Sequence, residues 1–129
     1  MPGQSRNPHP NALPNYQKAA IPPDKLVKYA LSPKHIAVVW GKSSGKDKAR
    51  VFKRALGFDE SNWELLRDRI LEELPYYEAV VGEADQYGKR YNVTLVIEGV
   101  NGNTANVLTA WIIRPGEDNP SLTSIRCLT

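Results

Sequence analysis

The second half of the chain has a two-residue hydrophobic period, and this period constrains the fold most strongly. From Tyr91 to Glu98 the apolar residues Tyr91, Val93, Leu95 and Ile97 alternate with mostly polar ones, as expected for a strand with one buried face. Asn101-Gly102 follows directly and is the strongest short-range signal for a tight hairpin. The same reasoning predicts four strands, near residues 77–81, 91–98, 104–114 and 122–128. We therefore expect a four-stranded antiparallel meander.

Helical periodicity precedes the strands. Residues 22–31 begin with two prolines and are predicted to form a short first helix, and residues 61–74 a later one, capped by Asp59 or by a Ser61–Glu64 capping box. Between them, residues 45–58 place Ala49, Phe52, Ala55 and Leu56 on one stripe, with cations on the opposite face. Helices followed by strands predict an α+β domain, with the helices packed on one face of the sheet.

The chain length of 129 residues fits one domain. Residues 1–23 hold six of the ten prolines, so residues 1–22 are predicted to form an extended, flexible N-terminal arm and residues 23–129 a single α+β domain.

Composition excludes several classes of protein. A single cysteine, Cys127, excludes an intrachain disulfide and any multi-cysteine zinc site. With two histidines, a metal site would need carboxylates for most of its ligands, so no metal or cofactor is expected. Gly41 to Lys46 has three residues between its glycines, and Asp47 follows the lysine, so it is not a P-loop.

No apolar run is long enough to span a membrane and no signal peptide is visible, which favours a cytoplasmic protein.

Charge is distributed unevenly, although the net charge is only +3. Residues 34–54 hold seven Lys or Arg and one Asp, whereas residues 59–73 hold six acids. A basic surface beside an acidic helix suits a polyanion on one side and a basic protein on the other, and two solvated helix faces are the simpler alternative.

The remaining chemistry consists of cationic and hydroxyl groups, which are sufficient for metal-free RNA cleavage. His35 is the candidate base or acid, Lys48 and Arg90 the candidate phosphate ligands, and Tyr87 or Thr109 a hydrogen-bond donor. Further candidate RNA contacts are Lys46, Arg50, Lys53, Trp111, Arg114 and Arg126. Each of these residues also has an ordinary structural interpretation, and Trp111 can stack on a base only if it faces the open side of the sheet.

Several short motifs resemble a small bacterial family classed as a domain of unknown function. They are Leu31–His35, Gly45–Phe52, Leu56–Phe58, Trp63–Leu66, Tyr87–Tyr91 and Thr109–Trp111. The resemblance covers about Leu13 to Leu128 and implies a toxin-like protein that acts with a small antitoxin. Its order of elements is also similar to that of ribonucleases such as barnase, EndoU, the tRNA-cleaving colicins and RelE. This chain differs from the family pattern at Ile36–Ser44, a segment that resembles an insertion.

The leading hypothesis is therefore a toxin-type, metal-independent ribonuclease that is neutralised by a small acidic partner protein. One alternative is a non-catalytic module that binds another protein, for example the partner or immunity component of such a pair. The other is an RNA-binding domain that does not cleave.

Overall fold

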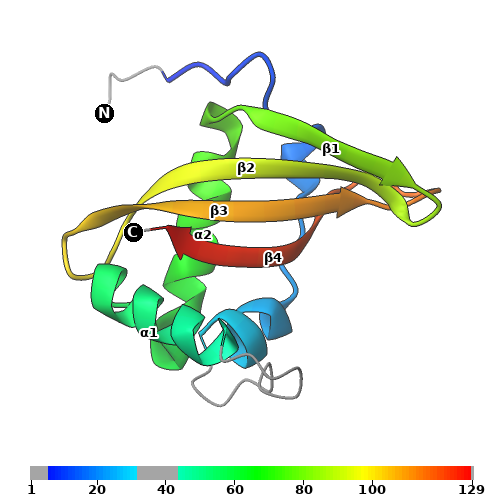
Figure 1. Cartoon of the computed structure of the whole chain (residues 1–129). Coiled ribbons are helices and arrows are strands. Elements are labelled where there is room, and N and C mark those ends of the chain that lie inside the picture. Colours follow the sequence, from blue (N-terminus) through cyan, green and yellow to red (C-terminus); the bar gives the residue numbers. More distant parts are fainter. Residues whose placement is uncertain (1–5, 32–43, 129) are drawn as a thin grey trace.

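A computed structural model of the chain describes residues 6–31 and 44–128, except for the side chains of residues 28–30 and 44–47. Helices occupy the first half and strands the second. The short helices are η1 (Tyr16–Lys18), η2 (Lys25–Ala30, a π-helix), η4 (Glu60–Asn62) and η5 (Leu74–Tyr76), and the longer ones are α1 (Ser44–Leu56) and α2 (Trp63–Glu73). The strands are β1 (Ala79–Asp85), β2 (Gly88–Glu98), β3 (Thr104–Ile113) and β4 (Ser121–Leu128). The predicted α+β class is confirmed (Figure 1).

The sheet is the predicted meander. Its strand order is β1-β2-β3-β4, and each neighbouring pair is antiparallel. β2 and β3 pair from Lys89↔Ile113 to Glu98↔Thr104 around the predicted Asn101-Gly102 turn, where Gly102 has a φ of 86°. The alternation along β2 is strict, because every second residue from Tyr91 to Ile97 is buried. The local period therefore set the register that buries one face of this strand.

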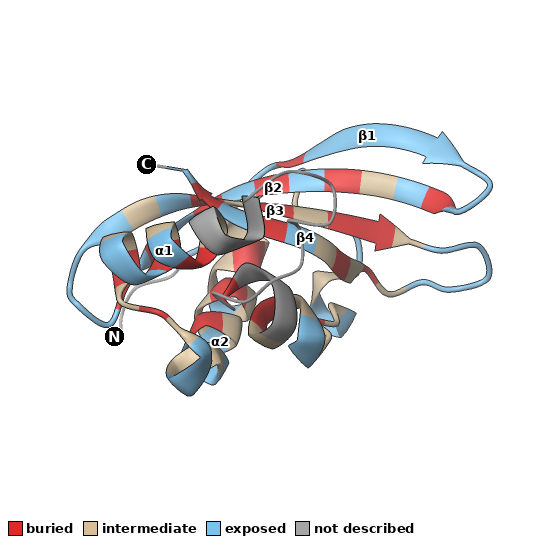
Figure 2. Cartoon of the chain, turned by 60° about the horizontal axis from the view of Figure 1, so that its bottom comes forward, coloured by how far each residue is buried: buried red, intermediate tan, exposed pale blue. Residues whose placement is uncertain are grey.

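The core lies between the sheet and the helices on its one covered face. α1, which packs on β3 and β4, contributes Phe52 and Leu56, and α2, which packs on β2, contributes Leu66 and Ile70. All four side chains are fully buried (Figure 2). Burying a side chain of this size stabilises the fold by about 1.5–3 kcal/mol. The apolar stripe predicted for residues 45–58 is thus the buried face of α1, and Arg50, Lys53 and Arg54 on the other side of the helix are exposed.

Residues 6–22 consist of turns, irregular segments and the short helix η1, and they contact the rest of the domain. Leu13 and Ile21 belong to the core. The backbone of Ala20 pairs in parallel with Ser121 at the edge of β4, and the Ala79 amide donates to the Asn11 carbonyl at 2.8 Å beside β1. The described part of the predicted arm therefore packs on the domain that was predicted to begin at residue 23, since it adds two side chains to the core and its backbone contacts β4 and the start of β1.

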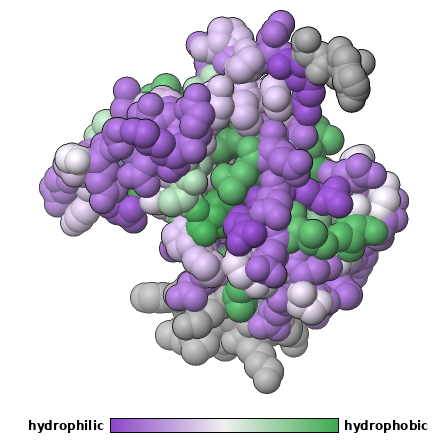
Figure 3. Space-filling model, turned by 180° about the vertical axis from the view of Figure 1, so that it is seen from behind, coloured by the Kyte–Doolittle hydropathy of each residue, from purple (hydrophilic) through white to green (hydrophobic). Residues whose placement is uncertain are grey.

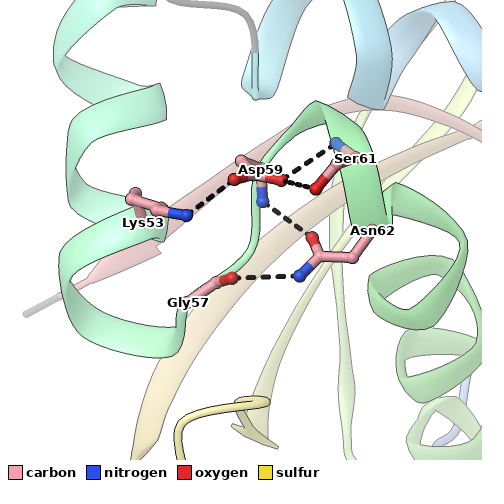
Figure 4. A network of polar contacts seen from close by, with 5 residues as sticks. All are labelled: Lys53, Gly57, Asp59, Ser61 and Asn62. Atoms are coloured by element: carbon pink, nitrogen blue, oxygen red, sulfur yellow. Dashed lines mark hydrogen bonds and ion pairs between the residues drawn. The ribbon is translucent and has the colours of Figure 1, made fainter.

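Asp59 begins the segment that leads into α2, through a network with α1 (Figure 4). Its carboxylate accepts from the Ser61 amide at 2.9 Å and from the Lys53 ammonium at 2.7 Å. Its own amide donates to the Asn62 side chain, which in turn donates to the Gly57 carbonyl. The capping box is therefore formed by Asp59 and Asn62, and the predicted Ser61–Glu64 box is wrong because Ser61 donates to Asp59 instead.

The β1–β2 hairpin projects beyond the helices. β1 is exposed over all its residues except Ala79, and Val80, Val81 and Tyr87 are 58%, 61% and 62% exposed (Figure 2). Seen from the side of the helices, this mostly hydrophilic lobe stands apart from the apolar surface in the middle of the molecule (Figure 3). Within the described residues, none of the helices has the length and apolar character needed to span a membrane.

Candidate anion-binding site

Three cations from three different elements lie near enough to one another, beside β4, for two of them to act electrostatically on the third. Lys25 lies on η2, Lys48 on α1 and Arg126 on β4, and these elements contact one another. We call these three residues the cationic cluster. Helical spacing places Lys48 next to the buried stripe of α1, so its side chain is half-buried although its ammonium is charged. The sequence placed Lys48 and Arg126 among the candidates but missed Lys25, which no local motif connects to them.

The electrostatics of the cluster favour an anion. The pKa of Lys48 is lowered, first by burial and then by the positive charges of Arg126 and Lys25. Neither Lys48 nor Arg126 forms an ion pair within the part of the chain that the structure describes. A phosphate placed here would relieve the repulsion among the cations, because an opposite charge favours the protonated form of lysine. The lowered pKa also makes the Lys48 proton easier to transfer.

Arg50 and Lys53 lie on the other flank of α1. They line a cavity of about 550 Å³ together with Leu31, Ala49, Asp59, Glu60 and Ser61. Lys53 is held by Asp59, and this ion pair is the first of the causes that lower the pKa of Asp59 to about 2. Lys53 therefore has a structural partner, whereas the Arg50 side chain is exposed. These two predicted RNA contacts do not belong to the cationic cluster.

Tyr87 and Arg90 lie at the far end of the sheet, in the projecting hairpin (Figure 1). Arg90 donates to the Asp85 carboxylate at 2.8 Å, and the Tyr87 amide donates to the same group at 2.9 Å. Asp85 consequently has a lowered pKa, caused first by Arg90. Strand register places Arg90 about 14 Å along the strands and about 10 Å across them from Arg126. The structure therefore does not bring Arg90 and Lys48 onto one phosphate.

Thr109 and Trp111 belong to the core. Both are fully buried, so Thr109 cannot donate to a substrate and Trp111 cannot stack on a base at the surface. Their positions along β3 explain this result, because every second residue of a strand points to the same face, and Thr109 and Trp111 share the covered face with Val107. The interpretation of both residues as site residues is wrong.

Other predicted site residues are not part of the cluster or cannot be placed. His35 lies outside the described residues, as does the side chain of Lys46. Arg114 is exposed after the end of β3, in the loop at the hairpin end of the sheet. Among the described residues, no group of three or more His, Cys, Asp or Glu could hold a metal ion.

The fold and this site define a class: an α+β domain whose helices cover one face of an antiparallel meander, with a cationic cluster beside one edge strand. The chain belongs to the family described as "Domain of unknown function (DUF6883)", whose model matches residues 12–127. This match confirms the resemblance to an uncharacterised domain family. No curated protein and no solved structure matches the chain.

Proposed function

We propose that this domain is a toxin-type, metal-independent ribonuclease whose phosphate-binding centre is the cationic cluster. The observation that carries the proposal is the half-buried Lys48, whose pKa is lowered by burial and by the positive charges of Arg126 and Lys25. A half-buried cation that has no ion pair with the described residues costs stability, so such a group is more readily explained by a ligand than by folding. The order of helices before a four-stranded antiparallel sheet also fits a fold of the barnase and RelE type.

The proposed reaction is attack of a ribose 2′-hydroxyl on the adjacent phosphorus. A base removes the hydroxyl proton, the new P–O bond forms, and the bond to the 5′-oxygen breaks as an acid protonates that oxygen. The products are a 2′,3′-cyclic phosphate and a free 5′-hydroxyl. Lys48 and Arg126 would stabilise the charge on the phosphorane, as positioned cations do in phosphoryl transfer. His35 remains the predicted base or acid.

The test is incubation of the purified chain with a labelled single-stranded RNA in excess EDTA. We expect fragments ending in 2′,3′-cyclic phosphate, and a loss of rate of about 10²-fold for Lys48→Ala and for Arg126→Ala. Lys18→Ala is the matched control, since it removes one positive charge from an ion pair with Asp118 outside the cluster. Intact RNA with the folded native chain would contradict the proposal.

Growth of a bacterial host that produces the chain alone tests the toxin aspect. The native chain should arrest growth, and a small acidic protein that covers the cluster should relieve the arrest. RNA binding without cleavage would appear as affinity that falls with salt and depends on Lys48, without any product.

A second candidate function is docking of a basic protein partner. The observation in its favour is Leu65, which is 46% exposed on α2 among the exposed acids Glu60, Glu64 and Asp68. A normal growth rate with abundant, folded native chain would favour this function over the toxin.

A further inference from the structure

β1 covers only part of the edge of β2. The two strands pair from Asp85↔Gly88 to Ala79↔Val93, but β2 continues to Glu98. Residues 94–98 pair with β3 on one side only, and no backbone hydrogen bond between described residues occupies their other side. The free edge is about 17 Å long, at about 3.4 Å per residue. It lies where β2 runs past the start of β1 (Figure 1).

A cleft of about 490 Å³ lies along this free edge. One wall consists of Val96 and Glu98 of β2 and Thr104 of β3. The other wall comes from the C-terminal half of α2 and the residues after it, with Arg69, Glu72, Glu73 and Tyr77, and Arg6 completes the lining. A strand edge that faces a helix across a groove is an arrangement that binds extended peptides by strand addition. The volume is also within the range of ligand sites.

The charges of the cleft favour a basic occupant. Arg6 and Glu73 neutralise each other through two hydrogen bonds of 3.1 Å, and the Arg6 guanidinium also lies 3.9 Å from the centre of the Tyr76 ring. Glu72 and Glu98 remain, with Arg69 as the only other cation in the described lining. Neither of these two carboxylates has an ion pair within the described chain. The cleft therefore keeps a surplus of negative charge.

The cleft also offers apolar contacts at its centre. Val96, in the middle of the free segment 94–98 of β2, is 44% exposed. Tyr77 is partly buried against the core. We infer that the free edge of β2 binds an extended segment of a partner protein in which apolar and basic residues alternate. Its backbone would pair with residues 94–98. Val96 and Glu98 share the exposed face of β2, so the apolar side chains of the segment would lie on that face beside Val96, and its basic ones would point to the opposite face, toward α2 and Glu72. Glu98 would add to the negative potential of the cleft.

The outer edge of β1 is less suited to such pairing. Its ladder with β2 is interrupted between Val81 and Ala84, and a bulge of this kind discourages the addition of another strand. The inference is also independent of RNA cleavage, because no residue of the cationic cluster lines the cleft.

The test uses an acetylated nine-residue peptide of alternating lysine and valine, added to the ¹⁵N-labelled full chain. In hydrogen exchange we expect at least tenfold slower exchange for alternate amides within residues 94–98, since alternate N–H groups of a strand point to the same side. A peptide with glutamate in place of lysine should bind at least tenfold more weakly, and so should one with a central proline. Protection of β1 or β4 instead, or equal binding of the three peptides, would overturn the inference.

Substitutions in the cleft test the recognition of charge. The double variant Glu72→Gln, Glu98→Gln should bind the lysine peptide three- to tenfold more weakly. Glu117→Gln, an exposed change in the loop between β3 and β4 and outside the cleft, should alter binding less than twofold. Unchanged affinity in the double variant would also overturn the inference. The three substituted side chains are exposed, so the variants are expected to fold and their affinities can be compared.

Discussion

The indole nitrogen of Trp111 donates a 2.8 Å hydrogen bond to the hydroxyl of Thr109, and that hydroxyl donates at 2.7 Å to the Val93 carbonyl. This chain of bonds joins β3 to β2 inside the core, where both side chains are fully buried. A buried tryptophan needs a partner for its N–H, and Thr109 supplies it. The Thr-Ala-Trp motif is therefore a structural feature of this fold.

Thr109→Val should destabilise the protein by about 1–3 kcal/mol, because it leaves the Trp111 N–H buried without an acceptor. Thr109→Ser should retain most of the stability, since it keeps the hydroxyl. Thr123→Val is the matched control, because the Thr123 hydroxyl donates to the Ala110 carbonyl in a partly exposed position. The measurement is urea denaturation, and an equal loss in the two valine variants would contradict the role given to Thr109.

Asp59→Ala should cost about 0.5–2 kcal/mol near neutral pH, the usual effect of removing an N-terminal cap. The folded pKa of Asp59, about 2, is lower than the ordinary 3.8. A carboxyl with a lowered pKa stabilises the fold above about pH 4 and loses this contribution as the pH falls through about 2. The difference between native and variant stability should therefore shrink between pH 4 and pH 2.

The control for this pH dependence is Lys53→Met, which removes the ion pair but leaves the hydrogen bonds from Ser61. It should cost less than Asp59→Ala, because an exposed ion pair contributes about 0–1 kcal/mol. A pH-independent difference for Asp59→Ala would show that its carboxylate charge is not what stabilises this junction.

Gly99→Ala should destabilise the protein by about 3 kcal/mol. A Cβ at this position would lie against the backbone of Leu56 at the end of α1, so the helix or the β2–β3 turn would have to move. Gly102→Ala is the control in the same turn. It meets no atom within 4 Å, but its φ of 86° makes it cost about 1–2 kcal/mol. A smaller loss for Gly99→Ala than for Gly102→Ala in denaturation would contradict this packing.

The elements could be predicted from the sequence because each depends on local patterns. The alternation in β2, the Asn101-Gly102 turn and the stripe of α1 are three such patterns, and each is formed by residues that are close together in the chain. Val107, Thr109 and Trp111 also share a parity in the sequence, but parity alone does not say which face of β3 the helices cover, so it did not exclude the last two as site residues. The cationic cluster could not be predicted in the same way, since Lys25, Lys48 and Arg126 come together only through the packing of η2, α1 and β4.

The extent of the N-terminal packing was equally hidden in the sequence. Prolines predicted an extended segment, and an extended segment can either be free or pack on a domain. The contact of Ala20 with Ser121 depends on where β4 begins, and the burial of Leu13 depends on the space that the helices leave. Local composition contains neither piece of information.

Lys48→Met should stabilise the folded protein at pH 7, by about 0.5–1 kcal/mol, while abolishing the proposed phosphate binding. The folded pKa of Lys48 is lower than its ordinary 10.5, so the charged form is disfavoured by folding. This penalty is fully present below the folded pKa and disappears as the pH rises from there to above 10.5, where the lysine is neutral in both states. The gain in stability should therefore vanish at high pH. Arg54→Met, an exposed change on the same helix, should show no such pH dependence in urea denaturation. A gain that persists above pH 10.5 would assign the effect to hydrophobic packing of methionine, whereas a loss at pH 7 would show that Lys48 supports the fold itself.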